Sequence, residues 1–378
     1  MQTIERTFDV VTGDTNMEDL HSMQDFPIFM GCVEHTEEKD IFSELTWQIN
    51  KKSGFLQLKK LIPLDILYHA QHESGVVGGI WMKHHHRFAQ FINKFKPNSV
   101  LELGGAHGIL SVNYSKFENI PWTILEPNPS PVDDCKAQFI QGFFDDKFNY
   151  SGSFNTIIHS HVFEHIYQPD DFMCHLSEFM APGNQLIFSL PNMQSMLERK
   201  YTNCINFEHT IFLTEPYVQY LLAKHGFSLI EKEYFMDDHS IFYAAVRDKN
   251  VKPTPLPSGL YEANKKLYIE YVAYHEALIA DLNQKMSQTS QPIYLFGAHV
   301  FAQYLLEMGL NTKKIVCLLD NDPKKQGCRL YGTKLNVASP KVLSEVKNPI
   351  VILKAGVYND EIKKNILEHI NKSTIFFE

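Results

Sequence analysis

The chain has 378 residues, 44% of them hydrophobic and 21% charged, which is the composition of an ordinary globular protein with two or three domains. Its formal net charge of −9 argues against a surface that binds the phosphates of nucleic acids. No apolar run approaches the length of a membrane span, the amino terminus does not resemble a signal peptide, and the six cysteines are widely scattered. We therefore expect a cytoplasmic protein with reduced thiols and without a membrane or nucleic-acid partner.

The first 75 residues carry weak signals for regular structure. Short apolar runs predict strands over residues 41–49 and 55–61, with Gly54 between them. Apolar residues then recur at helical spacing over residues 80–95, and the segment Lys96-Pro97-Asn98 ends this predicted helix. We treat residues 1–75 as a small N-terminal module.

Strand and helix patterns alternate from residue 99 to residue 246. The predicted strands cover residues 99–103, 122–126, 154–158, 184–190 and 242–246. Predicted helices cover residues 169–180 and 216–225, and Gly226 supplies a cap for the second helix. This alternation predicts an α/β core, residues 76–249, in which helices cover both faces of a doubly wound, mostly parallel sheet.

A proline-rich segment separates this core from a second, smaller unit. Residues 250–259 contain three prolines and a glycine, which favours an extended linker. One long helix is expected over residues 261–286, followed by strands at 292–296, 314–319 and 349–353. The rest of the chain is thus expected to form a linker with a long helix, residues 250–288, and a Rossmann-like C-terminal α/β domain, residues 289–378.

The strand at 99–103 leads directly into the turn Gly104-Gly105-Ala106-His107-Gly108. Glycine lets a backbone turn tightly and approach a ligand closely. Glu102 in this strand could hold the amino group of a methionine moiety, and Glu126 at the end of the next strand could accept both hydroxyls of a ribose. The glycine spacing differs from G-x-G-x-x-G, which disfavours a dinucleotide-dependent oxidoreductase.

These residues resemble the class I methyltransferases, which use S-adenosylmethionine. The resemblance continues through Gln141-Gly142-Phe143-Phe144, His161-Val-Phe-Glu-His-Ile166 and Ala181-Pro-Gly-Asn-Gln-Leu-Ile-Phe-Ser-Leu-Pro-Asn192. It implies that S-adenosylmethionine is the cofactor, and that the residues binding it are Glu102, Gly104, Gly105, Ala106, Gly108, Glu126, Gly142, Phe143 and His161.

Segments outside the core resemble one branch of this family, the C-methyltransferases that act on nucleotide-linked deoxysugars. Ser53-Gly-Phe-Leu-Gln-Leu58 is similar to the segment after that family's zinc cluster, and Asn206-Phe-Glu-His209 stands where the family has Y-x-E-H. Residues 295–299, 320–327 and 339–340 look like its C-terminal domain. The resemblance implies that a nucleotide-activated sugar is the substrate.

A histidine is the natural general base near neutral pH. The motif position implies that His209 is the catalytic base, with Glu208 or a neighbour orienting it. His165 is a second candidate, as a base or as a substrate contact. Asn206 replaces the tyrosine of Y-x-E-H, so methylation of a sugar hydroxyl is marginally favoured over methylation of a carbon that would need a phenol beside it.

The zinc cluster of the family has no counterpart in this sequence. The family uses four cysteines as zinc ligands. Here only Cys32 lies near a ligand position, and His35 could be a second ligand. The run His84-His85-His86 is not expected to bind metal either, because consecutive helical residues point in different directions, and we expect it to face solvent. We therefore expect no metal site.

Other functions remain open at this point. The chain could methylate another small molecule, such as an amine or a natural-product hydroxyl, or could be a non-catalytic binding protein with the same fold; the intact pair Glu208-His209 argues against the latter. An oxidoreductase that uses the C-terminal domain is the least favoured. The turn at 297–302 either binds a nucleotide or only packs, and we expect this domain to form a lid or wall over the nucleotide half of the substrate. A homodimer is compatible with the sequence.

Overall fold

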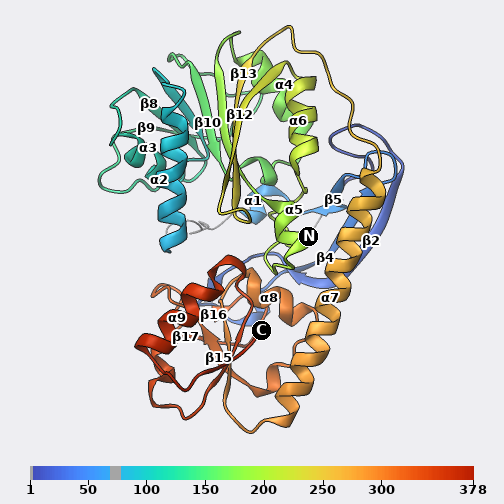
Figure 1. Ribbon diagram of the computed structural model, residues 1–378, viewed down its shortest axis with the longest axis vertical. Coiled ribbons are helices and arrows are strands. Elements are labelled where there is room, and N and C mark those ends of the chain that lie inside the picture. The colour runs from blue at the N-terminus through green and yellow to red at the C-terminus, as the bar shows by residue number, and fades with distance from the viewer. Residues whose placement is uncertain (1–2, 69–77) are drawn as a thin grey trace.

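The computed structural model describes residues 3–68 and 78–378, and it has two lobes joined along one side (Figure 1). One lobe contains a seven-stranded sheet and the other a five-stranded sheet. The long helix α7 (Leu260–Gln288) runs along both lobes. Among the helices in these residues, none is both long and apolar enough to cross a membrane.

The larger sheet confirms the predicted α/β core. Its strand order is β12-β13-β11-β10-β7-β8-β9, and neighbours are parallel except at β13. The order reverses between β7 and β10, so ligands are expected at the carboxyl ends of these strands. The strands are β7 (Val100–Leu103), β8 (Trp122–Glu126), β9 (Gln138–Gln141), β10 (Thr156–Ser160), β11 (Gln185–Pro191), β12 (Phe227–Phe235) and β13 (Ser240–Arg247).

Helices cover both faces of the core sheet (Figure 1). On one face, α2 (Gly79–Asn93) and α3 (Ile109–Tyr114) bury apolar side chains such as Phe88 and Leu110 against the strands. On the other face, α4 (Pro169–Phe179) and α6 (Glu215–Lys224) do the same. Each helix presents one apolar stripe to the sheet, as expected from the helical spacing in the sequence.

The smaller sheet forms the predicted C-terminal α/β unit. Its strands are all parallel, in the order β17-β15-β14-β18-β19. The order of this sheet reverses between β14 and β18. Its elements are β14 (Ile293–Phe296), α8 (Val300–Glu307), β15 (Ile315–Leu319), β17 (Val337–Ala338), β18 (Ile350–Leu353), α9 (Asn359–His369) and β19 (Ile375–Phe377).

The N-terminal module is built on a small antiparallel sheet in the order β2-β4-β5. The single strand expected over residues 55–61 is divided at Lys59 into β5 and β6, and β6 pairs with β1 instead. The elements of this module are β1 (Ile4–Glu5), β2 (Met17–Pro27), β4 (Phe42–Asn50), β5 (Leu56–Leu58), β6 (Lys60–Leu61) and α1 (Leu64–Leu67). The short helix α5 (Met193–Glu198) follows β11 of the core.

Aromatic packing holds this module against the rest of the chain. Trp47 of β4 is fully buried and stacks on Phe212 of the core, with ring centroids 4.3 Å apart. The same indole lies 6.2 Å from the ring of Tyr268 on α7. Burial of such large rings is among the strongest contributions to packing, so the module, the core and α7 are held as one structure.

A buried ion pair joins the N-terminal module to the C-terminal domain. Strand β3 (Cys32–Val33) pairs with β16 (Arg329–Leu330). Beside this pairing, Nη1 and Nη2 of Arg329 lie 2.6 and 2.9 Å from the two carboxylate oxygens of Asp40. Asp40 also accepts the backbone N–H of Gly332 at 2.8 Å, and its side chain is only 1% exposed.

The Asp40–Arg329 ion pair predicts an effect on thermal stability. Asp40→Ala should lower the Tm of the full chain, because it leaves the Arg329 guanidinium without its carboxylate; breaking a buried pair from one side typically costs about 3–5 kcal/mol. Thermal unfolding followed by circular dichroism measures the effect. Lys334→Ala is the matched control, since it removes only the exposed pair between Lys334 and Glu37 and should leave Tm nearly unchanged. Equal Tm values for the two variants would contradict the structural role of Asp40.

Candidate active site

The glycine-rich turn follows β7 at the reversal point of the core sheet. Gly104 and Gly108 have φ values of +70° and +73°, in the left-handed region that glycine tolerates. A Cβ at Gly104 would lie 2.7 Å from a methyl group of Val162, and a Cβ at Gly108 would lie 2.3 Å from the sulfur of Cys135. The turn therefore packs too closely against its neighbours for larger residues.

The two acidic residues expected at this turn occupy different environments. Glu126 is partly exposed and accepts the N–H of Ala106 at 2.9 Å and that of Asn128 at 3.0 Å. Its carboxylate thus stands at the open side of the turn, a position suited to ribose hydroxyls. Glu102 is buried beneath Gly105 and accepts the indole N–H of Trp122 at 2.7 Å.

Burial raises the pKa of Glu102 to about 7, although the bond from Trp122 opposes the rise. Glu102 therefore supports the turn, and its contact with a methionine amino group stays a prediction. Gly142 donates its N–H to the carbonyl of Glu126 at 3.2 Å, and the ring of Phe143 beside it is half-exposed. An exposed aromatic ring next to Glu126 suits stacking on an adenine. The turn, Glu126 and Phe143 together fit an adenosyl group.

The segment after β10 places histidines around a buried carboxylate. Glu164 belongs to the short helix η2 (Phe163–His165) and its side chain is 1% exposed. One of its oxygens lies 3.2 Å from Nδ1 of His161 and 3.8 Å from Nε2 of His165. Burial alone would raise the pKa of Glu164, but His161, His165 and His209 lower it to about 2. Glu164 is therefore ionised at neutral pH.

A tight turn presents His209 to the same carboxylate. Asn206 is buried, and its amide oxygen accepts the backbone N–H groups of Glu208 and His209, each at 2.8 Å. Its amide nitrogen lies 3.4 Å from Nδ1 of His209. The turn also holds His165, whose Nδ1–H donates to the carbonyl of Glu208 at 2.9 Å. Asn206 is thus a positioning residue, because its polar atoms are used within the turn.

The N-terminal module fixes this turn from behind. The buried guanidinium of Arg6 donates to the carbonyls of Thr210 at 2.8 Å and Tyr167 at 2.5 Å, which ties the His209 segment to the His165 segment. Strand β5 also holds the segment after His209, since Phe212 donates its N–H to the carbonyl of Leu56 at 3.0 Å. Burial lowers the pKa of Arg6 to about 9, so the guanidinium remains charged at neutral pH.

His165 and His209 face one another, with ring centroids 5.4 Å apart. A ring nitrogen of each and a carboxylate oxygen of Glu164 all lie within 4.8 Å of one another. Burial, helped by the charge of His165, lowers the pKa of His209 to about 4, although Glu164 and Glu208 oppose this shift. His209 is therefore neutral at pH 7, which is the form that can accept a proton. Glu164, rather than Glu208, supplies the carboxylate among these ring nitrogens.

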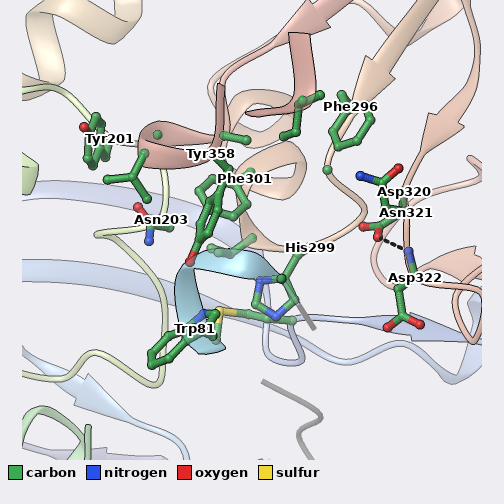
Figure 2. Close-up of a pocket in the computed structure, with 18 of the residues that line it drawn as sticks. Trp81, Tyr201, Asn203, Phe296, His299, Phe301, Asp320, Asn321, Asp322 and Tyr358 are labelled. Carbon is green, nitrogen blue, oxygen red and sulfur yellow. Dashed lines mark hydrogen bonds between the residues drawn. The ribbon is translucent and has the colours of Figure 1, made fainter. Parts of the chain in front are cut away.

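A large cavity of about 930 Å³ lies between the two lobes and reaches these histidines. The core contributes His161, Glu164, His165, Glu208 and His209, and the N-terminal module contributes residues 29–32. The opposite wall is the C-terminal domain, including the turn at 297–301 and the segment 320–325. Figure 2 shows Trp81, Tyr201 and Asn203 of the core lying close to His299, Phe301 and Tyr358 of the C-terminal domain. The turn at 297–301 therefore opens into the cavity.

Two residues correct the expectations from sequence. His84 does not face solvent: helix α2 buries it against Trp81 and Phe242, at ring-centroid distances of 5.2 and 5.3 Å, while His86 is exposed as expected. Glu164 was not among the site residues predicted from the sequence, although it lies inside the segment 161–166 that carries the family resemblance. The available signal was an acidic residue next to a histidine in an otherwise apolar segment.

Cys32 lies beside the turn of the C-terminal domain. Its thiol donates to the carbonyl of Ala298 at 3.5 Å, and burial raises its pKa to about 12. Within residues 3–68 and 78–378, the groups of three potential metal ligands include neither Cys32 nor His35.

Comparisons with known proteins agree with this architecture. The family model described as a methyltransferase domain matches residues 77–232, and the model described as a C-methyltransferase C-terminal domain matches residues 264–377. No curated protein matches the chain.

Several solved structures resemble the chain over less than half of its length. An S-adenosylmethionine-dependent methyltransferase from Mesorhizobium loti is 11% identical over 42% of this chain and 96% of its own, with a TM-score of 0.34. Magnesium protoporphyrin IX methyltransferase from Synechocystis, solved with bound S-adenosylmethionine, is 13% identical over 48% of this chain and 88% of its own, also with a TM-score of 0.34. A methyltransferase of Haloferax volcanii in complex with the Trm112 activator is 13% identical over 45% of this chain and 92% of its own, with a TM-score of 0.36.

The two family matches follow each other along the chain and coincide with the two observed α/β units. The strand order and the glycine turn are those of the class I fold expected from the sequence. The chain is an S-adenosylmethionine-dependent class I methyltransferase with a C-methyltransferase C-terminal domain.

Proposed function

We propose that the enzyme methylates a hydroxyl group of a nucleotide-activated sugar, with His209 as the general base. The observation that carries this proposal is the cavity, which has a histidine-lined end in the core and a second end at the turn of the C-terminal domain. A substrate with a reactive sugar and a bulky nucleotide matches a cavity of about 930 Å³ with two different ends.

The second end has features suited to a nucleotide. The turn after β14 and the end of β15 lie at the reversal point of the smaller sheet, where open α/β sheets bind ligands. Asp320 accepts the N–H of Ala298 at 3.0 Å, which holds the turn beside the cavity. This end carries charges of both signs, since Lys324 and Lys364 line it together with Asp320, Asp322 and Glu361, and Lys325 lies 3.2 Å from Asp320. The lysines are the side chains that would contact phosphates. We therefore place the nucleotide against the C-terminal domain and the sugar against His209.

S-adenosylmethionine supplies an electrophilic methyl group. The sugar oxygen would take this methyl group as its bond to sulfur breaks, which would release S-adenosylhomocysteine as a neutral thioether. His209 would accept the hydroxyl proton, and the nearby Glu164 carboxylate would stabilise the imidazolium that results. His165 would contact the substrate from the adjoining wall. Because Asn206 is buried and bonded within its turn, it cannot replace the family's tyrosine, which supports oxygen over carbon as the methyl acceptor.

The substrate assignment is tested by a mass-spectrometric screen. Purified enzyme is incubated with methyl-labelled S-adenosylmethionine and a panel of nucleotide sugars, together with the free sugars and simple amines. A mass gain of one labelled methyl group in a nucleotide sugar, retained after the nucleotide is cleaved, supports the proposal. Labelling of amines alone would favour the other small-molecule function.

The glycine turn predicts a cofactor-binding effect. Gly104→Val should weaken S-adenosylmethionine binding by at least about 100-fold, equivalent to about 3 kcal/mol, because the new side chain collides with Val162 and strains a left-handed residue. Isothermal titration calorimetry gives the affinity. Gly183→Val is the matched control, since Gly183 also has a positive φ (+88°) but no atom lies within 4 Å of its added Cβ. Unchanged affinity in Gly104→Val, or tight binding of NAD, would contradict the cofactor site.

A second prediction concerns the base. His209→Asn should lower kcat by about 10²–10⁴-fold, the usual contribution of a positioned base, and should leave the affinity for S-adenosylmethionine nearly unchanged. His165→Asn should cost less, since it removes a substrate contact. Steady-state kinetics and calorimetry on both variants separate the two roles. A near-normal kcat in His209→Asn would transfer the role to His165 or to another group.

The pH profile gives a third prediction. His209 is faced by His161, Glu164, His165 and Glu208, and its pKa is lowered to about 4. Only the neutral ring accepts a proton, so kcat/KM should be level at neutral pH and should fall only as the pH approaches about 4. His209→Asn should lose this acidic limb and His165→Asn should keep it. An acidic limb near 6.5 in the unchanged enzyme would contradict the assignment.

A further inference from the structure

Three histidines from distant parts of the chain converge at one end of the cavity. His84 comes from α2, His161 follows β10 and His239 precedes β13. One ring nitrogen of each lies within 4.8 Å of those of the other two. His84 and His239 are buried and His161 is largely buried, while His161 and His239 also line the cavity. Trp81 covers the group, with its ring centroid 5.0–5.2 Å from all three.

Polar groups on the outer side of this cluster lie against two of the rings, a carboxylate at His161 and a hydroxyl at His84. Glu164 is ionised and can only accept, and one of its oxygens lies 3.2 Å from Nδ1 of His161. A proton on Nδ1 would face this carboxylate and would leave Nε2 of His161 with a lone pair for an ion. A histidine held by a carboxylate on one ring nitrogen is the usual arrangement around a metal ion bound by the other nitrogen.

The second ring is His84. Its Nε2 lies 3.0 Å from the hydroxyl of Ser189. Its Nδ1 is buried, and no atom of residues 3–68 or 78–378 forms a hydrogen bond with it. Buried polar atoms without a partner are rare in native structures, and a missing ion is one of their ordinary explanations.

The third ring, His239, shares a contact with His161. The hydroxyl of Ser240 lies 2.7 Å from Nδ1 of His239 and 2.9 Å from Nε2 of His161, so these two nitrogens point toward one place. A rotation of Ser240 about one torsion would clear that place. Burial lowers the pKa of His239 to about 3 and that of His84 well below its usual value, so both rings are neutral, as ligands must be.

We propose that His84, His161 and His239 bind a divalent transition-metal ion, with Zn²⁺ as the preferred ion. Three imidazole nitrogens suit Zn²⁺ and its neighbours in the first transition series, whereas Mg²⁺ and Ca²⁺ require oxygen ligands. The Zn–N distance is about 2.0–2.1 Å, so the rings close around the ion when it binds. The cavity reaches His161 and His239, which leaves a fourth position for water or for a substrate oxygen.

A second group of potential ligands is the alternative place for the ion. Glu164, His165 and His209 also bring three donor atoms within 4.8 Å, but that group contains the proposed base. Its His165 variant therefore reports whether an ion binds there instead. His86 provides a matched control, because it lies on α2 two residues from His84 and is exposed.

The experiment is a titration of metal-free, full-length enzyme with Co²⁺ and with Zn²⁺. Visible absorption of bound Co²⁺ and calorimetry with Zn²⁺ should show one ion per chain with nitrogen ligands. His84→Gln and His239→Asn should each weaken binding by at least about 100-fold, since loss of an outer partner alone costs about 10–100-fold. His86→Ala and His165→Ala should bind as the unchanged enzyme does. Thermal unfolding and the affinity for S-adenosylmethionine show that each variant is folded.

Three outcomes would overturn the proposal. The unchanged enzyme could fail to bind either ion, or the folded His84→Gln and His239→Asn variants could both bind normally. Alternatively, His165→Ala could abolish binding while the other two variants retain it, which would place the ion at Glu164. The two substitutions in the proposed cluster act independently, so misfolding of one leaves the other to decide the result.

Discussion

The ionised carboxylate of Glu164 is the constraint on which the rest of the site depends. A charge that is 1% exposed is tolerated only when nearby donors or positive charges replace water. His161, His165 and His209 do so from two separate segments, and those segments must therefore keep their relative positions. In the mechanism proposed above, the same carboxylate would also stabilise the imidazolium formed at His209.

The N-terminal module supports this arrangement by holding the segments around Glu164 in place. The Arg6 guanidinium spans Thr210 and Tyr167, and β5 pairs with the residues just after His209, so the module ties together the two segments that surround Glu164. The aromatic stack of Trp47 on Phe212 anchors the same region. Packing and backbone hydrogen bonds thus position the turn without help from the cysteines that the sequence lacks.

The sequence predicted the strands whose apolar pattern arises directly from their burial in the fold. The strands observed as β7, β8, β10 and β11 are mostly apolar because they are covered on both faces, and the glycine turn and Glu126 lie at the ends of β7 and β8 as expected. β12 lies at the edge of its sheet, carries three charged residues and has a register shift between Leu229 and Glu231. β2 has two register shifts, so neither strand shows a regular alternation in sequence. The roles of His84 and Glu164 arise from contacts between distant segments, which no local pattern contains.

The position of the cavity follows from the orientation of the two sheets. The core sheet contributes residues after β10 and β11, and the smaller sheet contributes residues after β14, β15 and β18, so both sheets direct their carboxyl ends to one space. Ligands bind at such ends because loops there are free to carry polar groups while the strands stay apolar. Helix α7 runs along both lobes, and the Asp40–Arg329 pair joins the C-terminal domain to the N-terminal module. The distance between the two ends is consequently set by rigid elements, so a ligand that contacts both ends has to match that distance.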